Sequence, residues 1–344
     1  MKIARSALVA ASLLLGGALL EASLWAGLRN LGVVAALPNA LQSLFREAYR
    51  FGSRPIIQMD RSCTIHHGTL TYTLRPGTCA FSGAEFETRY HINSAGLRDD
   101  EESLEAPEII VLGDSTAMGW GVEQRDAFPS VLERKTGLKT LNAGVSSYGS
   151  VREMTLLGML DTRRLRHLLI QYSANDFEEN RMIRGPGDRL PIMDKETFER
   201  SQERFARGLG YFPGKHLLSL AKACLRRLRD VLYGAPDVSG EAEAFVRVLS
   251  LLGSPRLERA QVTLFAVDRD SPFADAVRQA LARGRQPRWL REAKVMDLSD
   301  IPRRENFYAL DGHLAPRGHE RVAEKLLAAS GLDIAQGSSS IGRR

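Results

Sequence analysis

The sequence has no dense run of basic residues interleaved with aromatic ones, although 47 Lys and Arg against 41 Asp and Glu give a formal net charge of +6 at pH 7. Its arginines are scattered along the chain, whereas nucleic-acid-binding proteins gather basic residues on one face or along one helix. We therefore expect no nucleic-acid partner and at most an unspecific attraction to anionic surfaces. The hydrophobic content of 44% is ordinary, and the length favours one globular domain with appendages.

Long hydrophobic runs are also scarce, because only one occurs, within residues 1–28, with Glu21 as its single interruption. Lys2 and Arg5 precede it, and roughly 20 apolar residues are needed to cross a bilayer. No clean A-x-A-like cleavage site follows the run, since Glu21 and Leu24 occupy places that should be small. This pattern favours an uncleaved signal anchor over a cleaved signal peptide. We expect the basic end to stay cytoplasmic and the remainder to be membrane-anchored on the extracytoplasmic, periplasmic side.

Cysteine is scarce, with three residues in the chain. Cys63 and Cys79 lie in one short segment, and an oxidising compartment would let them close a loop worth roughly 3 kcal/mol in the chain-entropy model. We expect this disulfide. Cys224 lies among leucines at helical spacing, which is typical of core filling. His66 and His67 lack a carboxylate or cysteine at useful spacing, so we expect no metal site.

Changes in residue pattern divide the chain into four regions. They are a membrane segment (1–28), a stalk and β platform (29–100), a main domain (101–332) and a polar tail expected to be disordered (333–344). The stalk is expected to be helical over about 29–55. Alternating apolar and polar residues at 69–74 (TLTYTL) and 85–92 are typical of a small antiparallel platform.

Short apolar runs alternate with helical patterns in the main domain. Strands are expected at 108–113, 139–142, 165–173, 261–268 and 293–298, and helices at about 126–136, 150–160, 273–283 and 316–329. Such alternation predicts an α/β fold, a flavodoxin-like three-layer arrangement with a parallel sheet covered on both faces. Residues 176–258 interrupt the alternation with a polar loop and helical segments. We interpret them as an insertion that caps the site.

Polar residues follow the expected strands at the points where ligands bind to an open parallel sheet, the carboxyl ends. The segments are Gly113-Asp114-Ser115, Asn142-Ala143-Gly144, Ser173-Ala174-Asn175-Asp176 and, after the last strand, Asp311-Gly312-His313. Together they offer a hydroxyl nucleophile, an imidazole base, a carboxylate to orient it and donors for an oxyanion. The sequence therefore predicts an acyl-transfer site.

The same segments resemble the conserved blocks of the SGNH (GDSL-like) hydrolase family. VLGDSTAMGWGV, LNAGVSSYG, YSANDF and DGHLAPRGHERVA occur in that family's order and spacing, and HINSAGLRDD resembles the segment before the nucleophile in many exported members. The resemblance covers roughly residues 90–330. The lipase elbow G-x-S-x-G is absent around Ser115, which argues against the ordinary α/β-hydrolase fold.

The resemblance implies a role for each matching residue. Ser115 would attack the ester carbonyl, and its backbone N–H would be one oxyanion donor. Gly144 would supply a second backbone N–H, because a residue without Cβ lets the chain approach the substrate closely. Asn175 would supply the third donor through its side-chain amide. His313 would take the proton from Ser115, and Asp311 would hold the His313 ring.

Other polar residues near these blocks have competing explanations. Asp114 is better explained as a turn or capping residue than as a catalyst, and Asn142 as the end of its strand. Ser146 and Ser147 carry hydroxyls but lack the strand-end position. Asp176 would either contact substrate or cap the next turn, and the sequence leaves both open.

The sequence departs from the family pattern at two places. Asp311 and His313 are two residues apart, whereas most members place the aspartate three residues before the histidine; the shorter spacing resembles variants related to polysaccharide O-acetylation proteins. Ala174 stands where glycine is usual, beside Asn175. His319 is a rival base, but its position early in the last helix favours a surface or capping role.

The resemblance implies a serine esterase that acts on O-acyl groups of a cell-envelope or exported carbohydrate. Acetyl is the leading candidate for the acyl group. One alternative is an O-acyltransferase of exopolysaccharide, which uses the same triad but delivers the acyl group to a sugar hydroxyl. Another is a non-catalytic carbohydrate-binding assembly protein, which would not need Ser115, Gly144, Asn175 and His313 together. We expect no metal or organic cofactor.

Overall fold

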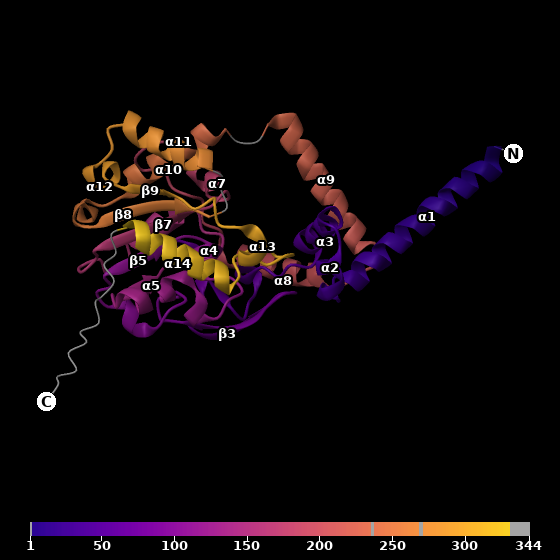
Figure 1. Ribbon diagram of the computed structural model, residues 1–344, viewed down its shortest axis with the longest axis horizontal. Helices are drawn as coiled ribbons and strands as arrows, with labels where there is room; N and C mark the ends of the chain where they lie inside the picture. The colour runs from indigo at the N-terminus through magenta and orange to yellow at the C-terminus, as the bar shows by residue number, and fades with distance from the viewer. Residues whose placement is uncertain (1, 235–236, 268–270, 331–344) are drawn as a thin grey trace.

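The computed structural model describes residues 2–234, 237–267 and 271–330 (Figure 1). Its centre is a five-stranded sheet in the order β6-β5-β7-β8-β9, with every neighbouring pair parallel. The strands are β5 (Ile109–Leu112), β6 (Thr140–Asn142), β7 (His167–Tyr172), β8 (Gln261–Ala266) and β9 (Lys294–Asp297). From β5 the chain first adds β6 on one edge of β5 and then adds β7 on the opposite edge of β5. The carboxyl ends of β5 and β7 therefore form the switch point where doubly wound sheets bind ligands.

Helices cover both faces of this sheet, as the alternation predicted. They are α5 (Phe128–Thr136), α6 (Ser150–Leu157), α10 (Val238–Leu252), α11 (Ser271–Arg283) and α14 (Pro316–Ser330). Ile110 and Leu112 share one buried cluster with residues of α6, α10 and α11, and Ile109 and Val111 share the other with α5 and α14. Successive strand residues point to opposite faces, so an unbroken apolar strand can fill two cores. The three-layer α/β fold is confirmed.

The segment 176–258 differs from the expected insertion, because its last helix, α10, belongs to the layer that packs on the sheet. The departure from alternation consists of α7 (Asp176–Asn180), α8 (Lys195–Leu209) and α9 (Lys215–Tyr233). Of these, α8 contacts the platform and α9 contacts the N-terminal helices. Cys224, expected in a core, is exposed on α9, since the leucines beside it also face solvent there.

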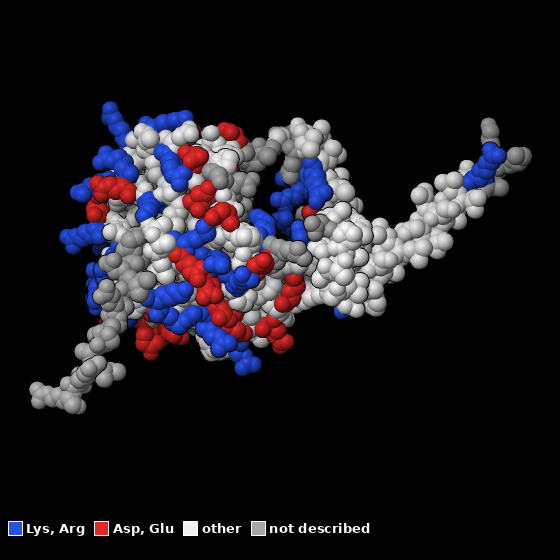
Figure 2. All heavy atoms as spheres, viewed as in Figure 1, with Lys and Arg blue, Asp and Glu red and all other residues white. Residues whose placement is uncertain are grey.

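The N-terminal helix α1 (Lys2–Gly27) projects away from the body of the protein (Figures 1 and 2). Leu13 and Leu14 are 72% and 76% exposed, and the helix is long and apolar enough to cross a membrane, a test that signal sequences also pass. Glu21, the one acid in the run, is buried and accepts hydrogen bonds from the backbone N–H groups of His216 (3.3 Å) and Leu217 (2.9 Å) at the start of α9. The expected stalk follows as α2 (Leu31–Ala36) and α3 (Asn39–Gly52).

The expected platform consists of two antiparallel hairpins, β1 (Thr64–His67) with β2 (Thr71–Leu74) and β3 (Gly77–Ser82) with β4 (Glu87–Ile92). Burial alternates along β4 as the sequence indicated. A disulfide joins Cys63, just before β1, to Cys79 in β3, with a Cα–Cα distance of 5.2 Å. His66 and His67 bond to backbone groups, and no metal-binding group of three or more ligands occurs within the described ranges. The polar tail at 333–344 lies outside the described residues.

Candidate active site

Ser115 is the first residue of a short helix, α4 (Ser115–Met118), directly after β5. Gly113 precedes it with φ +155°, and a Cβ there would come within 2.6 Å of the Gln171 Oε1 and 2.7 Å of the Ala117 Cβ. Asp114 accepts a hydrogen bond from the backbone N–H of Thr116 at 2.9 Å, so it caps α4 as expected. A sharp, glycine-dependent turn thus presents the serine hydroxyl at the edge of the sheet.

A buried arginine supports the chain that follows this turn. Arg98 is 1% exposed and donates hydrogen bonds to the carbonyls of Met118 (3.2 Å), Gly119 and Val122 (2.6 Å). Its guanidinium also lies 3.7 Å from the centroid of the Tyr90 ring. The Arg98 charge therefore holds the end of α4 against the platform.

The structure brings Ser115, His313 and Asp311 together across almost 200 residues of chain. The Ser115 Oγ lies 2.9 Å from the His313 Nε2, and the His313 Nδ1 is hydrogen bonded to the Asp311 Oδ1. The Trp120 ring stacks on His313, with centroids 4.6 Å apart and planes 17° from parallel. With Nδ1 held by a carboxylate, Nε2 is the ring nitrogen that can accept the serine proton.

Asp311 is ionised in this arrangement. Burial opposes ionisation, but the hydrogen bond and charge of His313, together with the Arg54 guanidinium, outweigh it and lower the pKa of Asp311 below its usual value. A carboxylate that stays charged can orient the His313 ring and stabilise its protonated form.

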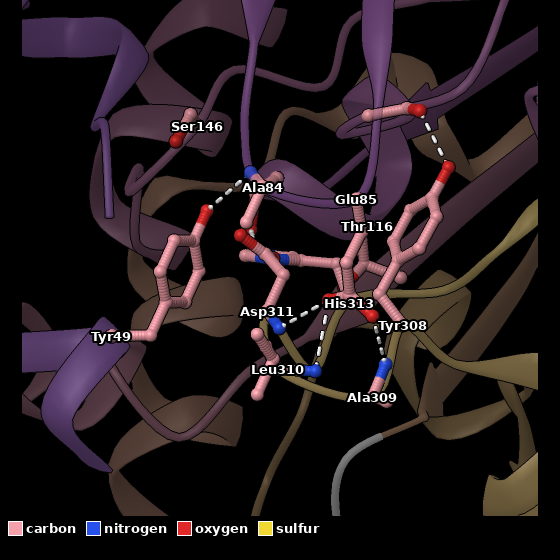
Figure 3. Close-up of polar contacts among 12 residues, drawn as sticks. Tyr49, Ala84, Glu85, Thr116, Ser146, Tyr308, Ala309, Leu310, Asp311 and His313 are labelled. Carbon is pink, nitrogen blue, oxygen red and sulfur yellow. Dashed lines mark hydrogen bonds and ion pairs between the residues drawn. The ribbon is translucent and has the colours of Figure 1, made fainter. Parts of the chain in front are cut away.

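Glu85 of the platform holds the loop that carries Asp311. Its carboxylate accepts hydrogen bonds from the backbone N–H groups of Ala309 (2.7 Å), Leu310 (2.8 Å) and Asp311 (2.8 Å), as Figure 3 shows. The Tyr308 hydroxyl adds a hydrogen bond to the Gly121 carbonyl at 2.6 Å. Sequence reasoning placed Glu85 only on one face of the platform, because a contact over 224 residues leaves no local signal.

We expect Glu85→Gln to lower kcat by about 10- to 100-fold with little change in KM, because misplacing a catalytic loop costs rate more than binding. The substitution removes the charge that accepts three amides and turns an NH₂ group toward them. Steady-state kinetics with an aryl acetate and a thermal melt measure the effect. Glu87→Gln on the exposed face of β4 is the matched control. An unchanged kcat in Glu85→Gln would contradict the support role.

Gly144 does not occupy the place expected of an oxyanion donor. Its backbone N–H donates to the Asn142 Oδ1 at 3.1 Å, and a Cβ at Gly144 would collide with the backbone of Ala117 and Met118. Glycine is thus required there because β6 and α4 approach closely. The expectation for Gly144 is wrong, and Asn142 does more than end its strand, since its side chain occupies the Gly144 amide.

Three other polar residues near the site separate into cavity-lining and buried groups. Asn175 lines the cavity beside Ser115, and its Nδ2 makes one long hydrogen bond of 3.4 Å to the Tyr148 carbonyl. Ser147 also lines the cavity, with φ +60°, a conformation that L residues seldom adopt. Asp176 instead does not line the cavity; it is buried and accepts a hydrogen bond from the Ser150 hydroxyl at 2.8 Å at the start of α6, a structural contact other than the two options that the sequence left open.

His319 is buried, not on the surface. It is 1% exposed, its Nδ1 accepts the backbone N–H of Phe128 at 3.3 Å at the start of α5, and its ring stacks on the Phe128 ring. Burial, with the charges of Arg98 and His313, lowers the pKa of His319 to about 3. The capping role is correct, and a ring that stays neutral and does not line the cavity at Ser115 is no rival base.

The cavity at Ser115 has a volume of about 570 Å³. The stalk supplies one side through Arg46, Glu47, Arg50 and Arg54, whereas no described residue of 176–258 lines it. The expectation that this segment caps the site is therefore wrong. Helix α8 packs against the platform and α9 packs against α3. The stalk, not these two helices, lies over the site.

No protein-family model matches the sequence, and no curated protein matches it. Among solved structures, the chain is similar to TesA at 14% identity, over 64% of this chain and 96% of that one, with a TM-score of 0.33. It is also similar to a lipolytic protein of the G-D-S-L family from Desulfitobacterium hafniense DCB-2, at 12% identity over 63% and 95% with a TM-score of 0.32. A third is a carbohydrate esterase whose active site displays divergent catalytic and non-catalytic binding functions, at 15% identity over 66% of both chains with a TM-score of 0.37. Identities and TM-scores this low assign no role to any residue of this chain. The roles of the site residues are therefore argued from the geometry of the site.

Proposed function

We propose that this chain is a serine esterase of the SGNH type. The observation that carries the proposal is the hydrogen-bonded series from the Ser115 hydroxyl through both nitrogens of His313 to the ionised Asp311, at the switch point of a parallel sheet. A binding module has no need for such a series, and each member is oriented by a separate contact.

The geometry supports a two-step reaction. The Ser115 Oγ attacks the acyl carbonyl while the His313 Nε2 takes the hydroxyl proton, and the tetrahedral intermediate expels the alcohol as His313 returns that proton to it. Water then attacks the acyl-serine with His313 as base. The carboxylic acid leaves, and Ser115 regains its proton.

Three donors are proposed for the oxyanion. Two are the donors that the sequence predicted, the backbone N–H of Ser115 at the start of α4 and the side-chain amide of Asn175. For the third we replace Gly144 by Ser147, which lines the cavity and whose backbone N–H has no acceptor among the residues that the structure describes. Removing one such donor costs on the order of a hundredfold or more in rate.

The proposed substrate is an O-acyl ester of a cell-envelope or exported carbohydrate, with acetyl as the leading candidate for the acyl group. The cavity is lined mainly by polar and charged side chains, which suits a hydroxyl-rich alcohol better than a long lipid. The apolar helix α1 would anchor the enzyme in a membrane, with the catalytic domain on the periplasmic side. The proposed chemistry needs no metal or organic cofactor.

Partitioning of the acyl group tests the proposal. The protein is incubated with 4-nitrophenyl acetate, without a saccharide and with either a neutral one (xylo-oligosaccharides) or an acidic one (oligogalacturonate), and free acetate and acetylated sugar are quantified. We expect acetate to dominate and a transient acetyl group on Ser115, seen by intact-protein mass spectrometry. If acetylated sugar dominates at modest acceptor concentration, the enzyme is an O-acyltransferase. The absence of any acyl-enzyme and any turnover would leave the binding-protein alternative.

A further inference from the structure

Four arginines line the cavity that contains Ser115. Arg46 and Arg50 lie one helical turn apart on α3, and Arg54 follows just beyond its end. Arg303, at the start of α13 (Arg303–Asn306), lines the same cavity from another part of the chain. A spacing of four residues separates side chains by roughly 6 Å along a helix. The guanidinium groups therefore form a row beside the nucleophile.

The carboxylates that line the cavity are engaged elsewhere, although the charges of Glu47 and Asp311 act on Arg50 and favour its protonated form. Asp114 caps α4, Asp311 is bound to His313, and Glu47 is paired with Arg227 at 3.0 Å. Within the described ranges, none of the four cavity arginines forms an ion pair with a carboxylate. Some exposed arginines elsewhere have such partners, as Arg200 has in Glu196 at 2.5 Å, whereas others, such as Arg134, bond only to backbone carbonyls.

Two of the arginines keep donors for a ligand. The Arg54 Nε is buried without a hydrogen-bond partner, while Arg46 uses its Nε on the Ala309 carbonyl at 2.9 Å and has its terminal nitrogens left. Burial and the neighbouring charges of Arg54 and Arg226 lower the pKa of Arg50, which is the expected result of crowding cations. Figure 2 shows blue side chains gathered in the hollow between the body and helices α3 and α9. An anion in the cavity would relieve this crowding.

We propose that the arginine row (Arg46, Arg50, Arg54 and Arg303) binds carboxylate groups on the alcohol part of the ester, so that the substrate is an acylated acidic saccharide. Guanidinium groups match carboxylates in a two-point geometry, and a row of them fits charges repeated along a chain better than one isolated charge. The inference rests on the proposed ester chemistry at Ser115 and adds the charge of its substrate.

A pair of substrates that differ only in charge tests the inference. O-acetylated oligogalacturonate carries free carboxylates, and its methyl-esterified form is the same saccharide with those charges removed. We expect kcat/KM for acetate release to be about tenfold or more higher for the charged form, mostly through KM, and the preference to shrink as salt rises. 4-Nitrophenyl acetate is assayed in parallel as a small neutral ester.

The variants Arg50→Gln and Arg46→Gln should each reduce the ratio of kcat/KM between charged and neutralised saccharide by about three- to tenfold. A general loss of activity lowers kcat/KM for both saccharides equally, so it leaves this ratio unchanged. Arg50→Lys should restore part of it, and Arg204→Gln on the exposed side of α8 is the matched control. A ratio near one in the natural protein, with 4-nitrophenyl acetate still hydrolysed, overturns the arginine row alone. Loss of all Ser115-dependent turnover overturns the ester chemistry instead.

Discussion

Ser115→Ala will reduce kcat/KM for ester hydrolysis by about 10³- to 10⁶-fold, the range seen when a nucleophile is removed from a triad that acts as a unit. The substitution deletes one oxygen at the end of β5, where the Ser115 Oγ lies 2.9 Å from the His313 Nε2. It leaves the Gly113 turn and the Asp114 cap unchanged. We therefore expect a melting temperature close to that of the unaltered protein.

The assay follows acetate release and the mass of the intact protein during turnover. Ser130→Ala, on α5 and outside the cavity, is the matched control and should keep both the rate and the acyl-enzyme signal. Substantial hydrolysis by Ser115→Ala would reject Ser115 as the nucleophile. In that case mass spectrometry of the trapped protein would show which other hydroxyl is acylated.

The alternation of apolar runs with helical patterns along the sequence predicted the layers of the fold and the location of the site. β5 is apolar throughout and β7 has an apolar centre, so their type was evident from composition and their burial on both faces from the surrounding helices. Because parallel strands end at one edge, Ser115, Asn175 and the His313 loop could be expected there together. Their meeting in the structure follows from topology.

Gly144 shows what a residue type alone cannot tell. Glycine is required wherever a Cβ would collide, and the sequence cannot say whether the neighbour is a substrate or another part of the protein. Here the neighbour is the backbone of α4, and the Asn142 side chain occupies the amide. Both facts depend on how closely β6 and α4 pack.

The cover over the site could not be predicted for a related reason. Two segments, α3 and α8 to α9, are amphipathic and have enough length to lie over the strand ends. Which one does so depends on how the platform and α1 pack against them, because these contacts link segments far apart in the chain. Glu85 belongs to the same class, since its three amide partners lie more than 220 residues away.

His313→Gln will lower kcat/KM by about 10³- to 10⁶-fold, nearly as much as the loss of Ser115, because the glutamine amide cannot take up the serine proton. Glutamine partly fills the space of the imidazole beside Trp120, so we expect the fold to persist. His91→Gln, on the exposed face of β4, is the matched control. Steady-state kinetics and a thermal melt separate the chemical effect from unfolding.

The double variant Ser115→Ala with His313→Gln shows whether the two residues act together. If the His313 Nε2 serves only to move the Ser115 proton, then removing the hydroxyl already removes the purpose of the base, and the double variant will be about as slow as either single variant. Its residual rate comes from binding and the oxyanion donors, which both substitutions leave in place. Losses that multiply would mean that His313 acts on a group other than Ser115, and the series from Ser115 to Asp311 would have to be reassigned.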